Sequence, residues 1–220
     1  MVLWLLNADL TDTERMTLDP AVLWGYTVEH LQLTLLSALI VLVIAIPLGI
    51  VLTRPSMRRF TGPVMAVANI GQAAPAIGLV VILAFWMGFG FRPAISALVL
   101  YAILPVLTNT MVGLKQVDER LVEAGRGMGM SSMAVLFKVE LPLAVPVMLS
   151  GIRTALVLLV GTATLATFVN GGGLGILITT GVNLNLTTVL VAGSILVALL
   201  ALLIDWLGRV VEQLARPKGL

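Results

Sequence analysis

The side chains that could take part in chemistry are few, and the most regular set lies inside an apolar stretch. Four residues recur there at every fourth position: Tyr101, Pro105, Asn109 and Gly113. This spacing places them on one face of a helix, and Thr108 lies beside Asn109. A later apolar stretch carries the hydroxyls of Thr162 and Thr164. Neutral groups of this kind either line the path of a small solute or bond membrane helices to one another, and the residues leave both interpretations open.

No residues have the spacing of a catalytic or nucleotide-binding motif. The chain has no cysteine and one histidine, His30, which excludes thiolate chemistry and any metal site built from several histidines. The pattern G-x(4)-G-K-[ST], which holds ATP phosphates, and the zinc pattern H-E-x-x-H are both missing. A net charge of +2 does not favour nucleic acid. We therefore expect no catalytic residue, no metal, no cofactor in this chain and no nucleic-acid partner.

The stretch EAGRGMGMSSMAVLFKVELP, Glu123–Pro142, places glycines and charges between two apolar segments. Asp118 is a suitable N-cap for a short helix at its start. Gly127 and Gly129 can end that helix, because glycine tolerates the left-handed backbone of a helix end. Ser131 or the serine after it can cap a second short helix, which we expect to end before the proline. The pattern predicts two short helices joined by a glycine turn.

The same stretch offers a surface that another protein could contact. Leu121, Ala124 and Met128 share one face of the first helix. The small residues Ala124 and Gly125 permit close approach, and Met128 and Met130 are adaptable apolar contacts. On the residues alone, this is either an interaction surface or an amphipathic loop that lies on the membrane.

A run of glycines follows the second hydroxyl-bearing stretch, in the sequence NGGGLGIL. Its members are Asn170, Gly171, Gly172 and Gly173. Consecutive glycines permit backbone shapes that other residues resist. The run is either a flexible turn or an outer gate or docking turn.

The elements that must position these residues are membrane helices. The chain has 220 residues, of which 59% are hydrophobic and 11% charged, whereas soluble domains carry roughly 25% charged residues. About five segments have the roughly 20 apolar residues that a bilayer requires. They are Leu31–Leu52, Val64–Trp86 with interruptions at Gly71, Pro75 and Gly78, Pro93–Leu114, Val145–Phe168 and Thr187–Leu207. We predict an all-α integral membrane protein.

Basic residues in the loops orient this bundle. One group of loops and the end of the chain hold Arg54, Arg58, Arg59, Lys115, Arg120, Arg126, Lys138, Arg209, Arg216 and Lys218. The opposite side holds Arg15 and Arg92. The positive-inside rule places the first group in the cytoplasm, so we expect the N-terminus outside and the C-terminus inside.

The stretch Glu123–Pro142 resembles the EAA loop of ABC importer permeases, written E-A-A-x(3)-G-x(9)-I-x-L-P. The positions that match in register are Glu123, Ala124, Gly129, Leu141 and Pro142. Gly125 replaces the second alanine and Val139 the isoleucine. The similarity extends from about Thr27 to Leu207, where stretches such as GQAAPAIGLVVIL and GTATLATFVNGGGLGILI resemble permeases of importers for glycine betaine, carnitine or choline.

The resemblance implies the type I importer fold, with a helical core similar to the methionine-importer permease, in a bacterial inner membrane. It implies three segments: an extracytoplasmic segment 1–26, a permease domain 27–208 with a coupling loop at about 115–142, and a cytoplasmic tail 209–220. Solute would move by alternating access, with a coupling helix at about 118–132 that follows the ATPase.

The expected partners are two copies of an ATP-binding subunit, which would hold ATP and Mg, a second permease that is either a copy or a sibling, an extracytoplasmic solute-binding protein and membrane lipid. Three alternatives stay open. They are a permease for another small solute such as an amino acid, a scaffold subunit without transport, and a transporter coupled to protons or sodium. The last usually holds an acidic side chain near the bilayer midplane, and no predicted span has one there.

Overall fold

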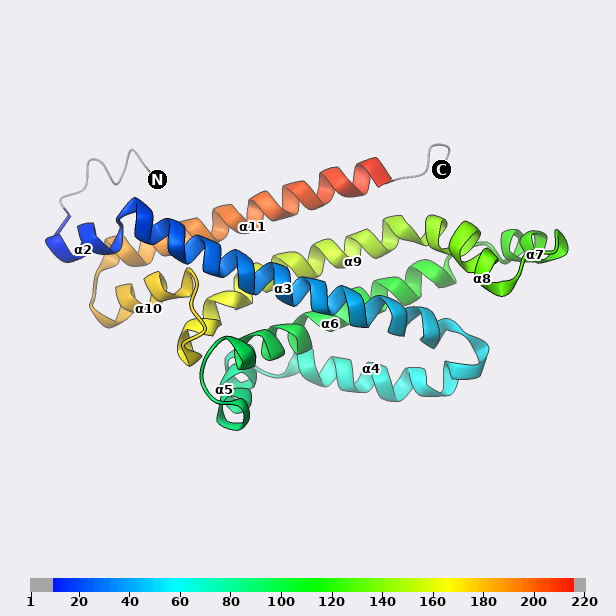
Figure 1. Ribbon diagram of the computed structural model, residues 1–220, viewed down its shortest axis with the longest axis horizontal. Coiled ribbons are helices and arrows are strands. Elements are labelled where there is room, and N and C mark those ends of the chain that lie inside the picture. Colours follow the sequence, from blue (N-terminus) through cyan, green and yellow to red (C-terminus); the bar gives the residue numbers. More distant parts are fainter. Residues whose placement is uncertain (1–9, 216–220) are drawn as a thin grey trace.

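The computed structural model describes residues 10–215, and every regular element in that range is a helix. Long helices lie side by side along the longest axis (Figure 1). The short helices α2 and α10 lie at one end of that axis, and α7 and α8 lie at the other (Figure 1). The all-helical fold class that the sequence predicts is therefore confirmed.

The first long helix begins earlier than the apolar pattern indicates. Helix α2, Asp12–Thr17, is a single capped turn in the N-terminal segment. Helix α3 spans Pro20–Thr53, whereas the predicted span began at Leu31. The side chain of Asp19 accepts a hydrogen bond of 2.9 Å from the backbone N–H of Ala21, and Pro20 fits the first helical position. This cap moves the start of the helix well outside the apolar stretch.

The second predicted span, Val64–Trp86, consists of two helices that meet at Pro75, one of its predicted interruptions. After a short 3-10 turn, η1 (Pro55–Met57), the chain forms α4, Arg58–Ala73, and α5, Ala76–Met87. The two parts are bent by 101°. The break has a local cause, since the residue before a proline avoids the helical region and Ala74, before Pro75, is extended with ψ 141°.

Helix α6, Phe91–Lys115, is the centre of the bundle and agrees closely with the predicted Pro93–Leu114. It packs against α3, α4, α5 and α9. Leu98, Ala102 and Val106 form its buried face, together with Val41 of α3 and Leu159 of α9. Small residues such as Ala102 let the neighbouring helices approach closely, as is common in membrane bundles.

The predicted pair of short helices is present, but its second member does not end before Pro142. Helix α7 spans Glu119–Gly127, and α8 spans Ser132–Val135. A π-helical turn, η2 (Leu136–Glu140), then leads directly into α9, Leu141–Thr162. Pro142 lies directly after this wider turn, which interrupts the α-helical bonding pattern where a proline ring would otherwise disturb it. The second short helix and the fourth span are therefore one continuous rod.

The last part of the chain contains one helix that the sequence did not reveal. The 3-10 segment η3, Ala163–Val169, ends at the left-handed Asn170. Helix α10, Gly175–Asn183, follows, and α11 runs over Thr187–Ala215. The predicted fifth span ended at Leu207, so α11 continues into part of the expected tail. Helix α10 was missed because it has only 9 residues, far fewer than the roughly 20 that a membrane span requires.

Four helical segments are long and apolar enough to cross a membrane: Pro20–Thr53, Phe91–Lys115, Ser132–Val169 and Thr187–Ala215. The bent pair α4–α5 raises the number to five if it is counted as one broken span. Within the described residues, the expectation of about five spans is therefore confirmed at this level.

Candidate functional site

The turn between α7 and α8 is built from local hydrogen bonds. The Asp118 side chain accepts a hydrogen bond of 2.9 Å from the backbone N–H of Arg120, as expected for the cap of α7. At the other end, the N–H of Met130 donates to the carbonyl of Gly125 at 3.1 Å, and that of Gly129 donates to Arg126 at 2.9 Å. This pair of bonds is the Schellman arrangement, which requires a left-handed residue between them. Gly129 supplies it with φ 82°.

We define the hairpin as residues 118–137. Its second helix, α8, is capped by a serine, as predicted. The Ser131 hydroxyl accepts a hydrogen bond of 3.2 Å from the N–H of Ala134. Gly125 is buried at the crossing of α7 and α8, where a Cβ would lie 3.4 Å from Val135 and 3.5 Å from the sulfur of Met130. These are ordinary van der Waals distances, so the alanine of the EAA pattern would also fit at this crossing.

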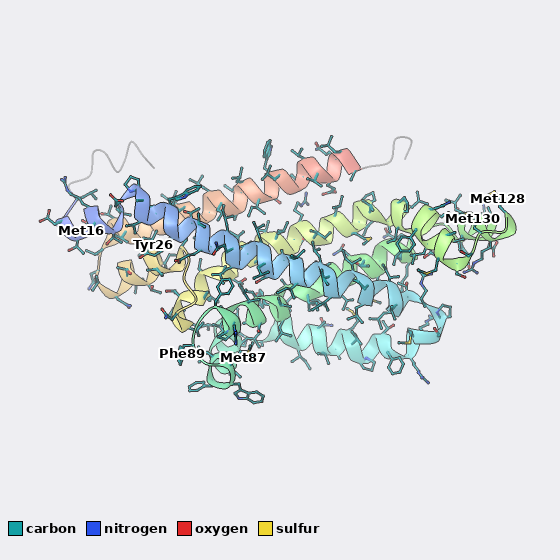
Figure 2. The ribbon with its side chains drawn as sticks, viewed as in Figure 1. Met16, Tyr26, Met87, Phe89, Met128 and Met130 are labelled. Atoms are coloured by element: carbon teal, nitrogen blue, oxygen red, sulfur yellow. The ribbon has the colours of Figure 1, made fainter. Side chains whose placement is uncertain are left out.

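The surface of the hairpin carries exposed large apolar side chains among exposed charged ones. Leu121 is 48% exposed, Met128 76%, Met133 61% and Phe137 60%. Glu123 and Ala124 are exposed beside them. Figure 2 shows Met128 and Met130 at the far end of the hairpin, beyond the bundle. Large apolar side chains grouped in this way mark a surface that a partner covers.

An ion pair fastens the base of the hairpin to the bundle. The two guanidinium nitrogens of Arg54, which follows α3, bind the two carboxylate oxygens of Glu140, with Nη1 at 3.1 Å from Oε1. The Glu140 side chain is only 9% exposed. Paired geometry of this kind holds both groups in a fixed orientation. No role for Glu140 was predicted from the sequence. Two signals were available: an acidic residue directly before the Leu141–Pro142 pair, and a basic residue at the end of the first span.

The polar face of α6 lies half-buried within the bundle. Tyr101, Thr108 and Asn109 are each half-buried. The Asn109 amide donates to the carbonyl of Pro105 at 2.9 Å in its own helix, and a Cβ on Gly151 of α9 would lie 2.5 Å from that of Asn109. This part of the face is therefore in direct contact with α9 in the same subunit.

The hydroxyls of Thr162 and Thr164 bond to their own helix. Thr162 donates to the carbonyl of Leu158 at 2.7 Å, and Thr164 donates to that of Gly161 at 2.7 Å. Thr164 also borders a cavity of about 370 Å³ between η3 and α10. The structure does not bring these hydroxyls to the face that carries Asn109.

The glycine run is a packed junction in this structure. Gly171 is buried, and a Cβ there would lie 3.0 Å from those of Ala166 and Ala94. Gly172 and Gly173 have φ of 84° and 89°. The N–H of Gly173 donates to the carboxylate of Glu29 at 2.9 Å. We call residues 170–173, with Glu29 and His30, the glycine junction.

Helix α3 supplies the other half of that junction. His30 is fully buried, and its Nε2 lies 2.9 Å from the carbonyl oxygen of Val160 in α9. Its Nδ1 would lie 3.1 Å from a Cβ on Gly173. A contact of Glu29 and His30 with the glycines was not predicted from the sequence. The available signal was the position of these two ionisable residues beside the first apolar stretch, on the same side of the membrane as the glycine run.

Ionisable groups meet inside the bundle where α9 contacts α11. Arg153 of α9 lies 3.5 Å from a carboxylate oxygen of Asp205 and 3.1 Å from one of Glu212. Arg209 also binds Asp205 one helical turn away. Both carboxylates therefore have guanidinium partners, which is a structural arrangement of charges rather than the open acidic site of an ion-coupled transporter.

Comparison with known proteins defines the class. The sequence profile described as "Binding-protein-dependent transport system inner membrane component" matches residues 45–217. The chain belongs to this family, and it is a transport permease of the bacterial inner membrane whose ATPase is a separate subunit.

Individual relatives sharpen this result. The chain is 41% identical over 194 residues to the glycine betaine/carnitine/choline transport system permease protein OpuCB of Bacillus subtilis, with 88% of each chain covered. It is 36% identical to the osmoprotectant import permease protein OsmW of Salmonella typhimurium, over 95% of this chain and 99% of the relative. The permease of the inward-facing MetNI methionine ABC transporter is similar in structure, with a TM-score of 0.79 and 25% identity over 94% of this chain and 100% of that one.

Proposed function

We propose that this chain is the permease subunit of an osmoprotectant importer, which carries a small solute of the glycine betaine, carnitine or choline type across the inner membrane. Relatives whose names specify these solutes align over nearly the whole chain. The observation that carries the proposal is the hairpin at the position of the EAA pattern, which is capped by its own hydrogen bonds and exposes large apolar side chains. A permease needs such a surface to receive the motion of its ATPase.

The assembly contains more than this chain. One ATP-binding subunit, which holds ATP and Mg, sits beneath each of two permeases, and a solute-binding protein delivers the solute from outside. Paired permeases such as OpuCB and OpuCD occur among the relatives, so the second permease is either a copy or a sibling. The hairpin of each permease follows its ATPase, and the helices then alternate between inward and outward opening.

Charge supports an orientation with the hairpin in the cytoplasm. The described basic residues of loops at the hairpin end are Arg54, Arg58, Arg59, Lys115, Arg120, Arg126 and Lys138; Arg216 and Lys218 lie outside the described residues. Arg15 and Arg92 come from the other loops. By the positive-inside rule, residues 10–26 and the glycine junction then face outward, and α11 ends toward the cytoplasm.

The solute route includes the α6 face with Tyr101, Thr108 and Asn109, and Thr162 and Thr164 nearer the outer side. The glycine junction, with Asn170 exposed and Gly171, Gly172 and Gly173 packed beneath it, is the outer gate. The hydrogen bond from the N–H of Gly173 to the carboxylate of Glu29 supports this assignment, because it is a single bond that opening of the gate would break.

Cysteine labelling tests the route, and the native chain adds no background because it lacks cysteine. Cysteines at Tyr101, Thr108 and Asn109 should react with small water-soluble thiol reagents, at rates that change when nucleotide is trapped. Leu107 and Met111 are buried at 0% and 5% exposure and serve as matched slow controls. Equal rates on both faces would show that the polar residues are helix-packing contacts.

Uptake measurements test the function as a whole. Uptake of radiolabelled glycine betaine or choline by cells should require ATP and the binding protein. It should persist when proton and sodium gradients are collapsed at constant ATP. Uptake by this chain alone, driven by an ion gradient in proteoliposomes, would favour a secondary transporter. If methionine or another amino acid competes better than betaine, the solute resembles that of the MetNI relative instead.

A further inference from the structure

A cavity of about 370 Å³ lies between η3 and α10, beside the glycine junction. The residues that line it are Thr164, Leu165, Thr167, Phe168, Gly175, Ile178, Thr179, Val182 and Asn183. This volume falls within the range of small-molecule sites. The contact of Gly175 with η3 closes one wall, since a Cβ there would lie 2.0 Å from the carbonyl oxygen of Thr164.

The three hydroxyls of the cavity have their hydrogens engaged within the protein. Thr164 donates to Gly161 at 2.7 Å, and Thr179 donates to the carbonyl of Ile176 at 3.1 Å. Thr167 lies 3.4 Å from the Thr179 hydroxyl and can donate to it. A hydroxyl that has given up its hydrogen offers only lone pairs. The polar part of the wall therefore presents partial negative charge and favours a cation without any carboxylate.

An aromatic ring lies at the mouth. Phe168 is 51% exposed and borders the cavity. An aromatic face attracts a quaternary ammonium group, whose methyl groups also need an apolar surface. Asn183, exposed at the same mouth, supplies amide N–H groups that can bind a carboxylate.

We propose that this cavity is a transient binding site for the trimethylammonium end of the solute, with Phe168 and the oxygens of Thr164 and Thr179 as its contacts. The proposal rests on the proposed function and adds the part of the solute that the permease itself recognises. The site has no formal charge among its lining residues, so it holds the cation weakly and can release it. Asn183 binds the carboxylate of a solute that has one. Choline has no carboxylate, and its cation makes the same contacts.

Three other cavities of the described chain lack this combination. The one between α3, α9 and α11 is apolar apart from Arg153, which would repel a cation. The one between α3, α4 and α6 has only apolar and glycine residues in its lining. The one at the base of the hairpin holds Arg54, Lys115, Glu119 and Glu140 and lies at the opposite end from the glycine junction.

Charge-selective labelling of the assembled complex tests the site. Thr179→Cys should react about tenfold faster with (trimethylammonium)ethyl methanethiosulfonate than with the sulfonatoethyl reagent, after correction for their rates with a free thiol. Millimolar choline or glycine betaine should slow the reaction. Adding Phe168→Leu should remove most of the preference. Asn183→Cys, at the mouth, repeats the measurement if Thr179→Cys does not assemble.

The control is Thr154→Cys, on the exposed side of α9, whose hydroxyl likewise donates to its own helix, at 2.9 Å to Ser150. It should show neither preference nor protection. Equal rates for the two reagents at Thr179→Cys and Asn183→Cys, or the same preference at Thr154→Cys, would overturn the site. Failure of the unmodified complex to take up any quaternary ammonium solute would instead overturn the proposed function.

Discussion

The hairpin and the glycine junction each contain a glycine with a left-handed backbone, but the surroundings of the two glycines differ. Gly129 has φ 82° and Gly173 has φ 89°, both in the left-handed region. A Cβ at Gly129 would meet nothing within 4 Å, whereas one at Gly173 would lie 3.1 Å from His30. The hairpin turn is therefore shaped by its own residues and leaves its surface free for a partner. The junction is shaped by a helix more than a hundred residues earlier in the chain.

The largest expected effect is a matched comparison of alanine at the two glycines. Gly173→Ala should destabilise the protein by about 2–5 kcal/mol, because backbone strain adds to a clash with buried His30. Gly129→Ala should cost only the strain, about 1–2 kcal/mol. The measurement is thermal unfolding of each variant in the same detergent. Equal losses would mean that the junction contributes nothing beyond its backbone angle.

The ion pair at the hairpin base gives the next effect, because it is the hairpin's tertiary attachment. Glu140→Gln or Arg54→Ala should each cost about 1–3 kcal/mol, reduced from the value for a fully buried pair because Arg54 is 33% exposed. The double variant should cost less than the sum of the two, since neither charge is then left alone. Additive losses in thermal unfolding would show that the pair contributes no coupling.

Association with the ATPase separates the turn from the stability of the bundle. Gly129→Leu should weaken co-purification of the permease with its ATPase about tenfold, since left-handed strain of 1–2 kcal/mol distorts the docking surface. The thermal unfolding of the isolated permease should change only by this backbone strain, as in Gly129→Ala. Gly127→Leu is the control for bulk, because Gly127 is helical and has open space around it. Unchanged association and transport in Gly129→Leu would count against a coupling role for the hairpin.

The smallest effect is local and lies at the end of the molecule that carries the junction. The backbone N–H of Thr11, and then the side chains of Thr188 and Thr11, hold the pKa of Glu14 below its ordinary value of 4.5. Because the pKa is lowered in the folded protein, this capping of α2 is fully present above about pH 4.5 and is lost as pH falls through the folded pKa. The protection of the Arg15 and Leu18 amides against hydrogen exchange, taken relative to the intrinsic rate at each pH, should fall at low pH. The same pH dependence in Glu14→Gln would assign the change to another group.

Several features were predictable because their causes lie within a few residues. The caps at Asp118 and Ser131 and the turn at Gly129 all depend on hydrogen bonds between residues at most five apart. The α4–α5 bend was visible as Pro75 but not as an angle, because a proline shows where a helix breaks and not how the second part then packs.

The remaining features depend on which distant segments meet. The predicted end of the second hairpin helix before Pro142 was wrong, since the π turn that accommodates the proline is part of a rod packed at Leu136 and Ala144. Partners for Arg54 and Arg153 could not be chosen from the sequence, where each basic residue has several acidic residues at unknown distance. Helix α10 was hidden because a short apolar segment after a glycine run does not show whether the chain folds back as a helix.

By itself the sequence determined that the chain is helical and embedded in a membrane, that it resembles the permease family, and that a capped glycine hairpin projects from it. The helical membrane class and the hairpin follow from composition and from bonds among near neighbours, whereas the resemblance rests on the EAA motif and the stretches around it. Only the tertiary structure decided that Glu29 and His30 hold the glycine run, across separations of 144 residues to Gly173 and 130 to Val160. The physical reason is that a glycine's tolerance of φ near 89° is a local property, whereas the buried side chain that crowds a Cβ at that position comes from another helix.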